Sequence, residues 1–327
     1  MSLAGKNLAS GHNAIAAARY RQIAIKDKKV MEKKLFDAIS LRKSTRNYTN
    51  IDIEKKAIKD IENFTSQIPT LSNFKVNFRI FKNEPGIIDL IHPLSSFLIQ
   101  APYFFIVSCR KEKNYLEEAG FQSEHLILYL TSKNLNTCYI GGMIDFIALE
   151  KKIHLPDNEK IIIFSPIGKS KDNFFNFFQD LQLKTCMMIT GIDLNRKKLN
   201  EIVFHNIWEN KDIVNIEDKL LEIFSQVQLA PSWCNIQPWR FIVTDSKIYL
   251  FMANPNLKDE ILGHKNTWDN DYRKFDVGIA MSHFNIAAKY LNFRGNWFFP
   301  TEKDYDKLLY LKVPSNIELI SVWDKSL

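Results

Sequence analysis

The sequence of 327 residues has little of what marks several common protein classes. Its four cysteines are far apart and form no CxxC or Cys/His cluster, so we expect reduced thiols and no metal site. Its longest apolar run, around Phe97–Cys109, is interrupted by Gln100 and Pro102 and is shorter than the roughly 20 residues that a membrane helix needs. With only eleven glycines and eleven prolines, the chain is neither collagenous nor rich in linkers. We therefore predict a globular, cytoplasmic protein without a membrane partner.

The sequence also lacks a Walker-type or Rossmann glycine-rich loop, so we expect no separate nicotinamide-binding domain. Of the net charge of +7, most lies in residues 1–30, which hold six basic residues against the single acid Asp27. The remaining body carries only +2, which is a poor electrostatic match for DNA or RNA. We expect a small-molecule partner and no nucleic acid.

Residues 1–30 differ from the rest of the chain, because they are rich in alanine and contain no acid before Asp27. An amphipathic helix is predicted to begin at Met31. Two interpretations of the first thirty residues are open: a cloning leader ahead of a start at Met31, or a basic organelle transit peptide. The abrupt change of composition favours the leader, and in both cases we expect the segment to lie outside the fold.

Two helical segments of the body resemble each other. Residues 120–139 align without gaps on residues 278–297, and the alignment pairs Gly120 with Gly278 and His125 with His283. Apolar residues at three- and four-residue steps predict further helices at equivalent places, over 53–68 and 216–230. Histidines that recur on helices are more often packing or polar-cap residues than catalytic ones. The order of helix, loop, strand and glycine-led helix in both halves predicts a pseudo-twofold repeat.

Runs of β-branched and aromatic residues predict the strands. They are Val76–Phe81, Phe104–Cys109 and Ile161–Phe164 in the first half, and Arg240–Thr244, Lys247–Met252, Leu309–Val313 and Leu319–Trp323 in the second. Long helices interleaved with few strands indicate an α+β fold with a central sheet flanked by helices. We divide the body into a first repeat over 31–168, a connector over 169–200 and a second repeat over 201–327.

A cluster of cations and hydroxyls follows the first predicted helix. It consists of Arg42, Lys43, Ser44, Thr45 and Arg46. Such a set can bracket a phosphate and a polyol chain, and the planar fork of arginine binds phosphate in a bidentate way. Taken alone, the cluster fits a solvated helix end better, because cations there favour the negative end of the helix dipole.

A loop in the second half, between a predicted helix and strand, is dense in polar and aromatic groups. Its members are Pro231, Ser232, Trp233, Cys234, Asn235, Gln237, Pro238 and Trp239. The polar side chains offer donors and acceptors to a flat heterocycle, and the indoles can wall it. An ordinary turn with structural tryptophans is the alternative. The density of polar groups between two prolines favours a binding loop.

Together these segments resemble the nitroreductase family. RKSTR at 42–46 is similar to the family's R-x-S-x-R flavin motif, and residues 230–241 are similar to its more specific P-S-x-x-N-x-Q-P-W loop. Residues 138–143, 163–168 and 196–203 resemble its post-helix segment, its late strand with a glycine turn, and its basic segment. The resemblance extends from about Met31 to the end of the chain.

The resemblance implies a nitroreductase-like fold and an FMN cofactor, which ordinary members bind at a homodimer interface with residues from both chains. Here the losses are complementary. The first half keeps R-x-S-x-R but has only Pro69–Phe74 in place of the loop, whereas the second keeps the loop but has His205–Glu209 in place of R-x-S-x-R. One chain then carries one complete site, as in a fused dimer, and can act as a monomer.

Carried over by motif, the first-half ligands for the flavin phosphate and ribityl chain are Arg42, Lys43, Ser44 and Arg46. From the second half, Pro231, Ser232, Trp233, Asn235 and Gln237 approach the ring. Gly141 and Gly142 offer backbone N–H groups near flavin N5, and Lys169, Lys171, Arg196 and Lys197 are further phosphate candidates. Three departures from the family pattern are Cys234 in the loop, Lys169 in place of an aromatic residue, and the long connector.

The resemblance implies hydride transfer from NAD(P)H to an electron-poor substrate such as a nitroaromatic or a quinone. In such enzymes the cofactor performs the chemistry, so we expect no catalytic side chain. Two alternatives remain open at this point: a flavin-binding scaffold without turnover, and a different flavin chemistry on the same fold.

Overall fold

The computed structural model describes residues 22, 25–84, 101–140, 144–171, 195–253 and 271–326. Several expectations fall outside these ranges. They are the two glycines Gly141 and Gly142, most of the N-terminal segment, and most of the connector over 169–200. Residues 25–41 are helical, so the first helix covers six residues before Met31.

The helices and strands of the first half are α2 (Lys55–Gln67), β1 (Asn77–Lys82), β2 (Tyr103–Cys109), α4 (Tyr115–Ser132), β3 (Asn136–Thr137), α5 (Phe146–Lys152) and β4 (Lys160–Gly168). Those that follow are α7 (Leu199–Ile202), β5 (Val203–His205), α8 (Asp218–Val227), the 3-10 turn η2 (Trp233–Asn235), β6 (Trp239–Val243), β7 (Lys247–Met252), α10 (Arg273–Tyr290), β8 (Asn296–Phe298), α11 (Glu302–Tyr305) and β9 (Glu318–Asp324). The mixture of helices and mostly antiparallel sheets confirms the α+β class.

Each half has its own sheet, and the two sheets share one strand order. The first sheet runs β1-β2-β4-β3 and the second runs β5-β6-β7-β9-β8. Every pairing from β1 to β3 and from β6 to β8 is antiparallel, and β5 adds to the edge of β6 in parallel. The register shifts once between β2 and β4 and once between β7 and β9.

The strands carry apolar residues toward both faces of their sheets, because successive side chains point to opposite sides. In β2, Phe105 and Val107 join the core between the halves, whereas Phe104 and Ile106 pack with Leu149 of α5 on the outer face. The second sheet has a corresponding outer cluster around Phe251. Both sheets are thus covered on two sides, which explains their nearly continuous apolar sequences.

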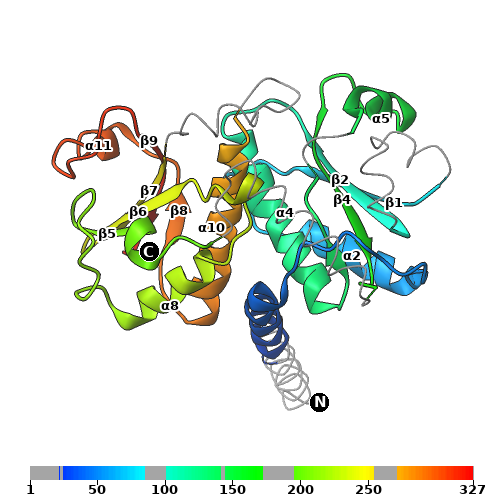
Figure 1. Ribbon diagram of the computed structural model, residues 1–327, viewed down its shortest axis with the longest axis horizontal. Coiled ribbons are helices and arrows are strands. Elements are labelled where there is room, and N and C mark those ends of the chain that lie inside the picture. Colours follow the sequence, from blue (N-terminus) through cyan, green and yellow to red (C-terminus); the bar gives the residue numbers. More distant parts are fainter. Residues whose placement is uncertain are drawn as a thin grey trace, which may run out of the picture.

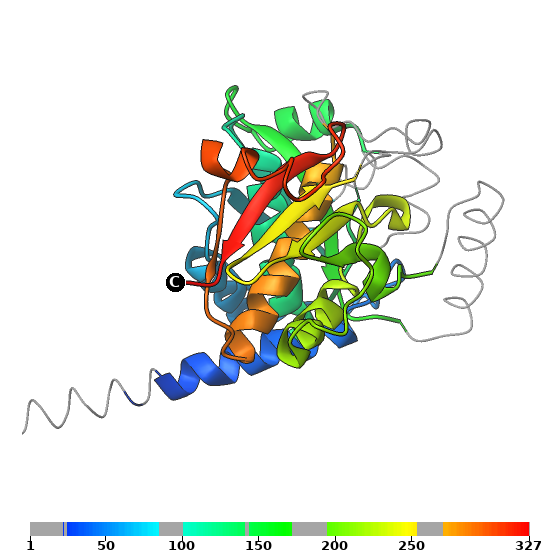
Figure 2. The ribbon, with the colours of Figure 1, turned by 90° about the vertical axis from the view of Figure 1, so that its left-hand side faces the viewer.

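Helices α4 and α10 lie side by side between the two sheets (Figure 1). Seen from the side of the second sheet, α10 lies behind β7 and β9 (Figure 2). Both helices are buried around almost their whole circumference, as expected for helices at the centre of a fold. Their close approach depends on two glycines: a Cβ on Gly120 would lie 2.0 Å from the Phe275 carbonyl oxygen, and one on Gly278 would lie 2.1 Å from that of Glu117.

The predicted helices over 120–139 and 278–297 begin earlier and end sooner than expected. After α4 and α10, Asn134 and Asn292 adopt left-handed backbone angles, with φ of 60° and 52°, which ends the helical path. The short strands β3 and β8 follow.

The strand predicted at Leu309–Val313 is wrong, because these residues form turns after α11. The apolar composition misleads here. Leu309 is 89% exposed, and Lys312 has a left-handed φ of 56°, which no regular strand permits. Leu311 packs into the outer cluster of the second sheet from this turn.

Candidate functional site

Arg42 lies directly after the first helix and reaches into the centre of the molecule. Its backbone N–H donates to Ala38 O at 2.9 Å and so closes the last helical turn. Its side chain is only 10% exposed, and its Nε lies 3.9 Å from Oε1 of Glu124 on α4. Within the described part of the chain, this buried Nε has no hydrogen-bond partner. A buried, incompletely bonded guanidinium is costly unless something else completes its bonding.

The rest of the cation cluster is held beside β3. Ser44 pairs with Thr137, and the Thr45 N–H donates to Thr137 O at 2.9 Å. The hydroxyl of Tyr48 donates to Thr45 O and fixes the following turn. Lys43 and Ser44 are exposed, and Arg46 is half-buried. Residues 43–46 therefore form an extended segment that is hydrogen-bonded to β3, and not a frayed helix end.

The loop of the second half has an unusual backbone. Cys234, Asn235 and Gln237 have positive φ angles of 46°, 56° and 52°, in the left-handed region that is costly for residues with a Cβ. Such strain gathers at binding sites, where the surrounding structure enforces it. The Ser232 hydroxyl accepts the Gln237 N–H at 2.9 Å and so closes the loop on itself.

The side chain of Gln237 joins this loop to the end of the connector. Gln237 is 2% exposed, its Nε2 donates to Asn195 O at 3.0 Å, and its Oε1 accepts the Lys197 N–H at 2.9 Å. Asn235 also donates to Asn195 O, at 3.0 Å. These bonds fix the residue between the two, Arg196, against the loop.

Arg196 is hydrogen-bonded to the segment before the second-half loop and is within the electrostatic influence of Arg42. Its guanidinium donates to Ala230 O at 2.6 Å and Leu229 O at 3.3 Å, just before the loop. Burial, followed by the neighbouring charge of Arg42, lowers the pKa of Arg196 to about 10. Arg42 of the first half and Arg196 beside the second-half loop are therefore electrostatic neighbours.

Trp233 is attached to the central helix α10. Its backbone N–H donates to Oδ2 of Asp276 at 3.0 Å, and its ring stacks on Tyr272 with centroids 6.3 Å apart. Burial raises the pKa of Asp276 well above its usual range. Among the described residues, the Trp233 indole Nε1 is buried without a hydrogen-bond partner. The indole N–H is thus a buried donor that the described residues leave unbonded.

The first half has a counterpart of this attachment. Oε2 of Glu118, on α4, accepts the Ser72 N–H at 2.9 Å, and Oε1 accepts the Leu71 N–H at 3.0 Å. In both halves a carboxylate of the central helix thus holds the loop that follows the amphipathic helix.

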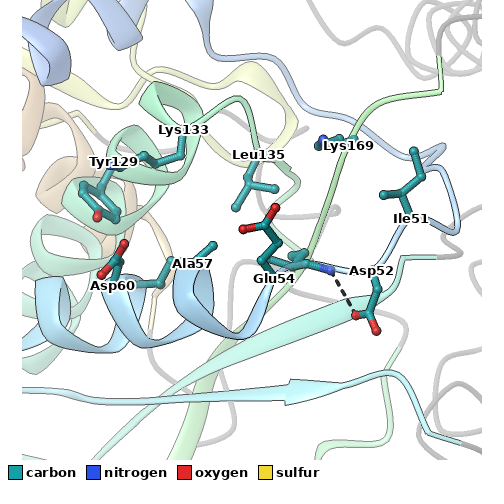
Figure 3. A pocket seen from close by; sticks show the side chains of 11 residues that line it. Ile51, Asp52, Glu54, Ala57, Asp60, Tyr129, Lys133, Leu135 and Lys169 are labelled. Carbon is teal, nitrogen blue, oxygen red and sulfur yellow. Dashed lines mark hydrogen bonds between the residues drawn. The ribbon is translucent and has the colours of Figure 1, made fainter.

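Lys169, a predicted phosphate ligand, pairs with the segment after the cation cluster, because its carbonyl oxygen accepts the Thr49 N–H at 2.9 Å. Its side chain lines a pocket of about 300 Å³ whose other lining residues all belong to the first half. Figure 3 shows Lys133, Leu135 and Lys169 along one side of this pocket and Glu54 and Asp60 along the other. Neither Arg42 nor the loop of the second half contributes to it.

No sequence motif marks Glu124, which is fully buried beside Arg42. Its Oε2 accepts the Tyr139 hydroxyl at 2.8 Å, and its Oε1 lies 2.9 Å from Nε2 of His283 on α10. The sequence held one signal, because the alignment of the two halves pairs Glu124 with the small residue Ser282. His283, interpreted as a packing or polar-cap residue, is fully buried at this contact.

Arg42 thus lies beside the Glu124 carboxylate, and the charges of both act on Arg196. The carboxylate already accepts a hydrogen bond from Tyr139 and contacts His283. This donor set suits an anion with several oxygens, because arginine offers donors in a fixed fork. The described ranges contain no cluster of three or more His, Cys, Asp or Glu that could hold a metal ion. They also contain no helix with the length and apolarity needed to cross a membrane.

A model of the family described as "Putative TM nitroreductase" matches residues 34–288. A crystal structure of a "putative nitroreductase" from Thermotoga maritima is similar with a TM-score of 0.55 and 18% identity, over 90% of this chain and 94% of that one. An FMN-dependent nitroreductase from Clostridium difficile R20291 matches 42% of this chain and 87% of its own, with 19% identity and a TM-score of 0.38. No curated protein is significantly similar in sequence.

Proposed function

Because the chain belongs to the "Putative TM nitroreductase" family, we propose that it is an FMN-dependent oxidoreductase with one flavin site per chain. Family membership supports a general flavin oxidoreductase. Our proposal adds the cofactor FMN, the reductant NAD(P)H, and an electron-poor small molecule, such as a nitroaromatic or a quinone, as the substrate.

The observation that carries this proposal is the anchoring of Arg196 against the strained loop, with the buried Arg42 close enough for its charge to act on Arg196. FMN combines a phosphate, a polyol and a flat ring, and it needs cationic, hydroxyl and ring-edge contacts. In our proposal Arg42, Arg46 and Arg196 hold the phosphate, with Ser44 at the ribityl chain. The Nε of Arg42 is directed toward Glu124, which would leave the rest of the guanidinium for the phosphate. Bound FMN would supply the hydride chemistry at its ring.

The second-half loop would hold the ring side of the cofactor. Pro231, Ser232, Trp233 and Asn235 are half-buried, so their surfaces remain accessible to a ligand. Gln237 differs, because its amide bonds to Asn195, Asn235 and Lys197 within the chain. We propose that Gln237 shapes the site by fixing Arg196. The roles of Lys43, Lys169 and Lys197, and of Gly141 and Gly142 outside the described residues, rest on the family resemblance alone.

We further propose that the chain is an internal repeat that replaces the two subunits of the family homodimer and can act as a monomer in the cytoplasm. The reciprocal contacts of the central helices support it. Gly120 packs on the Phe275 carbonyl and Gly278 on that of Glu117, and both pairs differ by the same shift of 158 residues as the sequence alignment. A twofold axis produces such pairs of contacts, in which the same two positions meet once in each direction.

A flavin spectrum during reduction tests this proposal. The purified protein is loaded with FMN, desalted and titrated anaerobically with NADPH and, in a second sample, with NADH. We expect a retained flavin absorbance that a nicotinamide bleaches and that a quinone then restores. A retained flavin that neither nicotinamide bleaches would contradict the proposed enzyme and favour a scaffold or another flavin chemistry. A protein that retains no flavin would contradict the cofactor as well.

A further inference from the structure

We propose that Glu124 and His283 form a positioning pair that orients Arg42 for a phosphate group and leaves the positive charge of Arg42 available to it. This inference rests on the proposed flavin function and adds two residues that the motif comparison does not assign. The pair connects α4 to α10 across the centre of the molecule.

The position of Glu124 is fixed from several sides. Its carboxylate has no solvent exposure, and each oxygen has its own contact, Oε2 with the Tyr139 hydroxyl at 2.8 Å and Oε1 with His283 Nε2 at 2.9 Å. Such a carboxylate cannot rotate without losing a buried hydrogen bond. The Nε of Arg42 lies 3.9 Å from Oε1, so Glu124 attracts the guanidinium at its Nε side. The rest of the guanidinium can face an anion.

The hydrogen bonds of His283 determine the charge of the pair. Its Nδ1 lies 2.9 Å from the Gln226 carbonyl oxygen, which only accepts, so Nδ1 carries a proton. Its Nε2 faces the Glu124 oxygen at 2.9 Å, so one proton lies between these two atoms. Whether that proton is on the ring or on the carboxyl group, the pair has no net charge. Glu124 therefore orients Arg42, while His283 cancels the negative charge that would otherwise neutralise Arg42.

The pseudo-equivalent position provides the contrast. There His125 Nδ1 lies 2.9 Å from the Ser282 hydroxyl and 2.9 Å from the Phe121 carbonyl oxygen, with no carboxylate in either contact. Burial lowers the pKa of His125 to about 3, so that ring is neutral. The alignment that pairs His125 with His283 also pairs Ser282 with Glu124. The carboxylate occurs only on the side that has Arg42, which agrees with one phosphate position per chain.

The test compares FMN with riboflavin, which lacks the phosphate. Dissociation constants for both are measured by quenching of flavin fluorescence in wild type, Glu124→Gln and Ser282→Ala. For Glu124→Gln we expect FMN binding to weaken about tenfold, which corresponds to the loss of roughly one charge-assisted contact between Arg42 and the phosphate. Riboflavin binding should change less than about twofold. Ser282→Ala removes a buried hydrogen bond at the matched position and should leave the ratio of the two constants unchanged.

His283→Gln is a second variant, in case Glu124→Gln does not fold, and circular dichroism melting establishes folding for each protein. Glutamine can still donate to a carbonyl but cannot carry a positive charge, so we expect the same selective loss of FMN affinity. Equal weakening of FMN and riboflavin would mean a structural role for the pair, and tighter FMN binding would mean that Glu124 repels the phosphate. Either result, or unchanged FMN affinity, overturns this inference but leaves the flavin site intact. A wild-type protein that binds neither flavin contradicts the proposed function itself.

Discussion

Replacing either glycine at the crossing of α4 and α10 should push the two halves apart. A Cβ on Gly120 would lie 2.0 Å from the Phe275 carbonyl oxygen and 2.9 Å from its carbon, both backbone atoms that cannot rotate away. Ordinary contact begins near 3.4 Å, so the helices would have to separate by more than an ångström. We place the cost of this overpacking at about 3 kcal/mol, the upper end of its usual range.

The alanine also brings a gain, because alanine is favoured over glycine inside a helix by about 1 kcal/mol. Gly120→Ala should therefore lower the free energy of unfolding by about 2 kcal/mol, which corresponds to roughly 3 °C in melting temperature for a chain of this length. Gly278→Ala should cost a similar amount, since its Cβ meets the Glu117 carbonyl oxygen at 2.1 Å.

Thermal and urea unfolding of both single variants and of the double variant measures this prediction. One separation of the helices relieves both contacts, so we expect the double variant to lose less than the sum of the single losses. A raised melting temperature for Gly120→Ala would mean that helix propensity outweighs the contact and would refute the reasoning. Additive losses would mean that the two glycines do not share one packing contact.

Three further predictions follow from buried groups. Burial raises the pKa of Glu117 to about 7, above its unfolded value of 4.5, so the protonated form stabilises the fold below pH 4.5 and this contribution is lost as the pH rises through 7. Relative to wild type, the free energy of unfolding of Glu117→Gln, measured with urea, should rise by about 3 kcal/mol between pH 4 and pH 9. The same pH dependence of this free energy in both proteins would contradict the prediction. Burial also raises the pKa of Cys109 to about 12, so its thiol should not react with iodoacetamide at pH 8 in the native protein. Half-buried Cys234 should be alkylated under the same conditions, and peptide mass spectrometry measures both residues. Equal labelling of the two cysteines would contradict this prediction. Gln237→Ala leaves the Lys197 N–H without its acceptor and should lower the free energy of unfolding by about 2 kcal/mol. It should also weaken FMN retention. Unchanged retention would show that Arg196 does not depend on Gln237 for its position.

The helices and strands could be predicted from sequence where the periodic pattern of apolar residues is long enough. The helix predicted over 53–68 is α2 at Lys55–Gln67, and the strand predicted at Lys247–Met252 is β7 with the same bounds. Strands β3 and β8 have two and three residues, which is too short for any period to be visible. The composition of Leu309–Val313 favours a strand, because composition does not reveal the left-handed φ of Lys312.

The candidate site could be predicted only as local motifs. The cation cluster and the polar loop are contiguous in sequence, so their residue types were visible. The contact of Glu124 with His283 joins residues 159 positions apart and depends on how two helices cross. The hydrogen bond between Gln237 and Lys197 is equally non-local, and it is the basis of our proposal that Gln237 shapes the loop. Spacing within one motif carries no information about such contacts.

The central claim is that Arg42 of the first half and the loop of the second half form one flavin site in a single chain. Native mass spectrometry of the FMN-loaded protein counts chains and flavins in the same particle, with Arg42→Ala as the control. We expect one FMN for each chain, and we expect it to be lost or strongly reduced in Arg42→Ala. Two FMN for each chain, or one FMN shared by two chains, would contradict it.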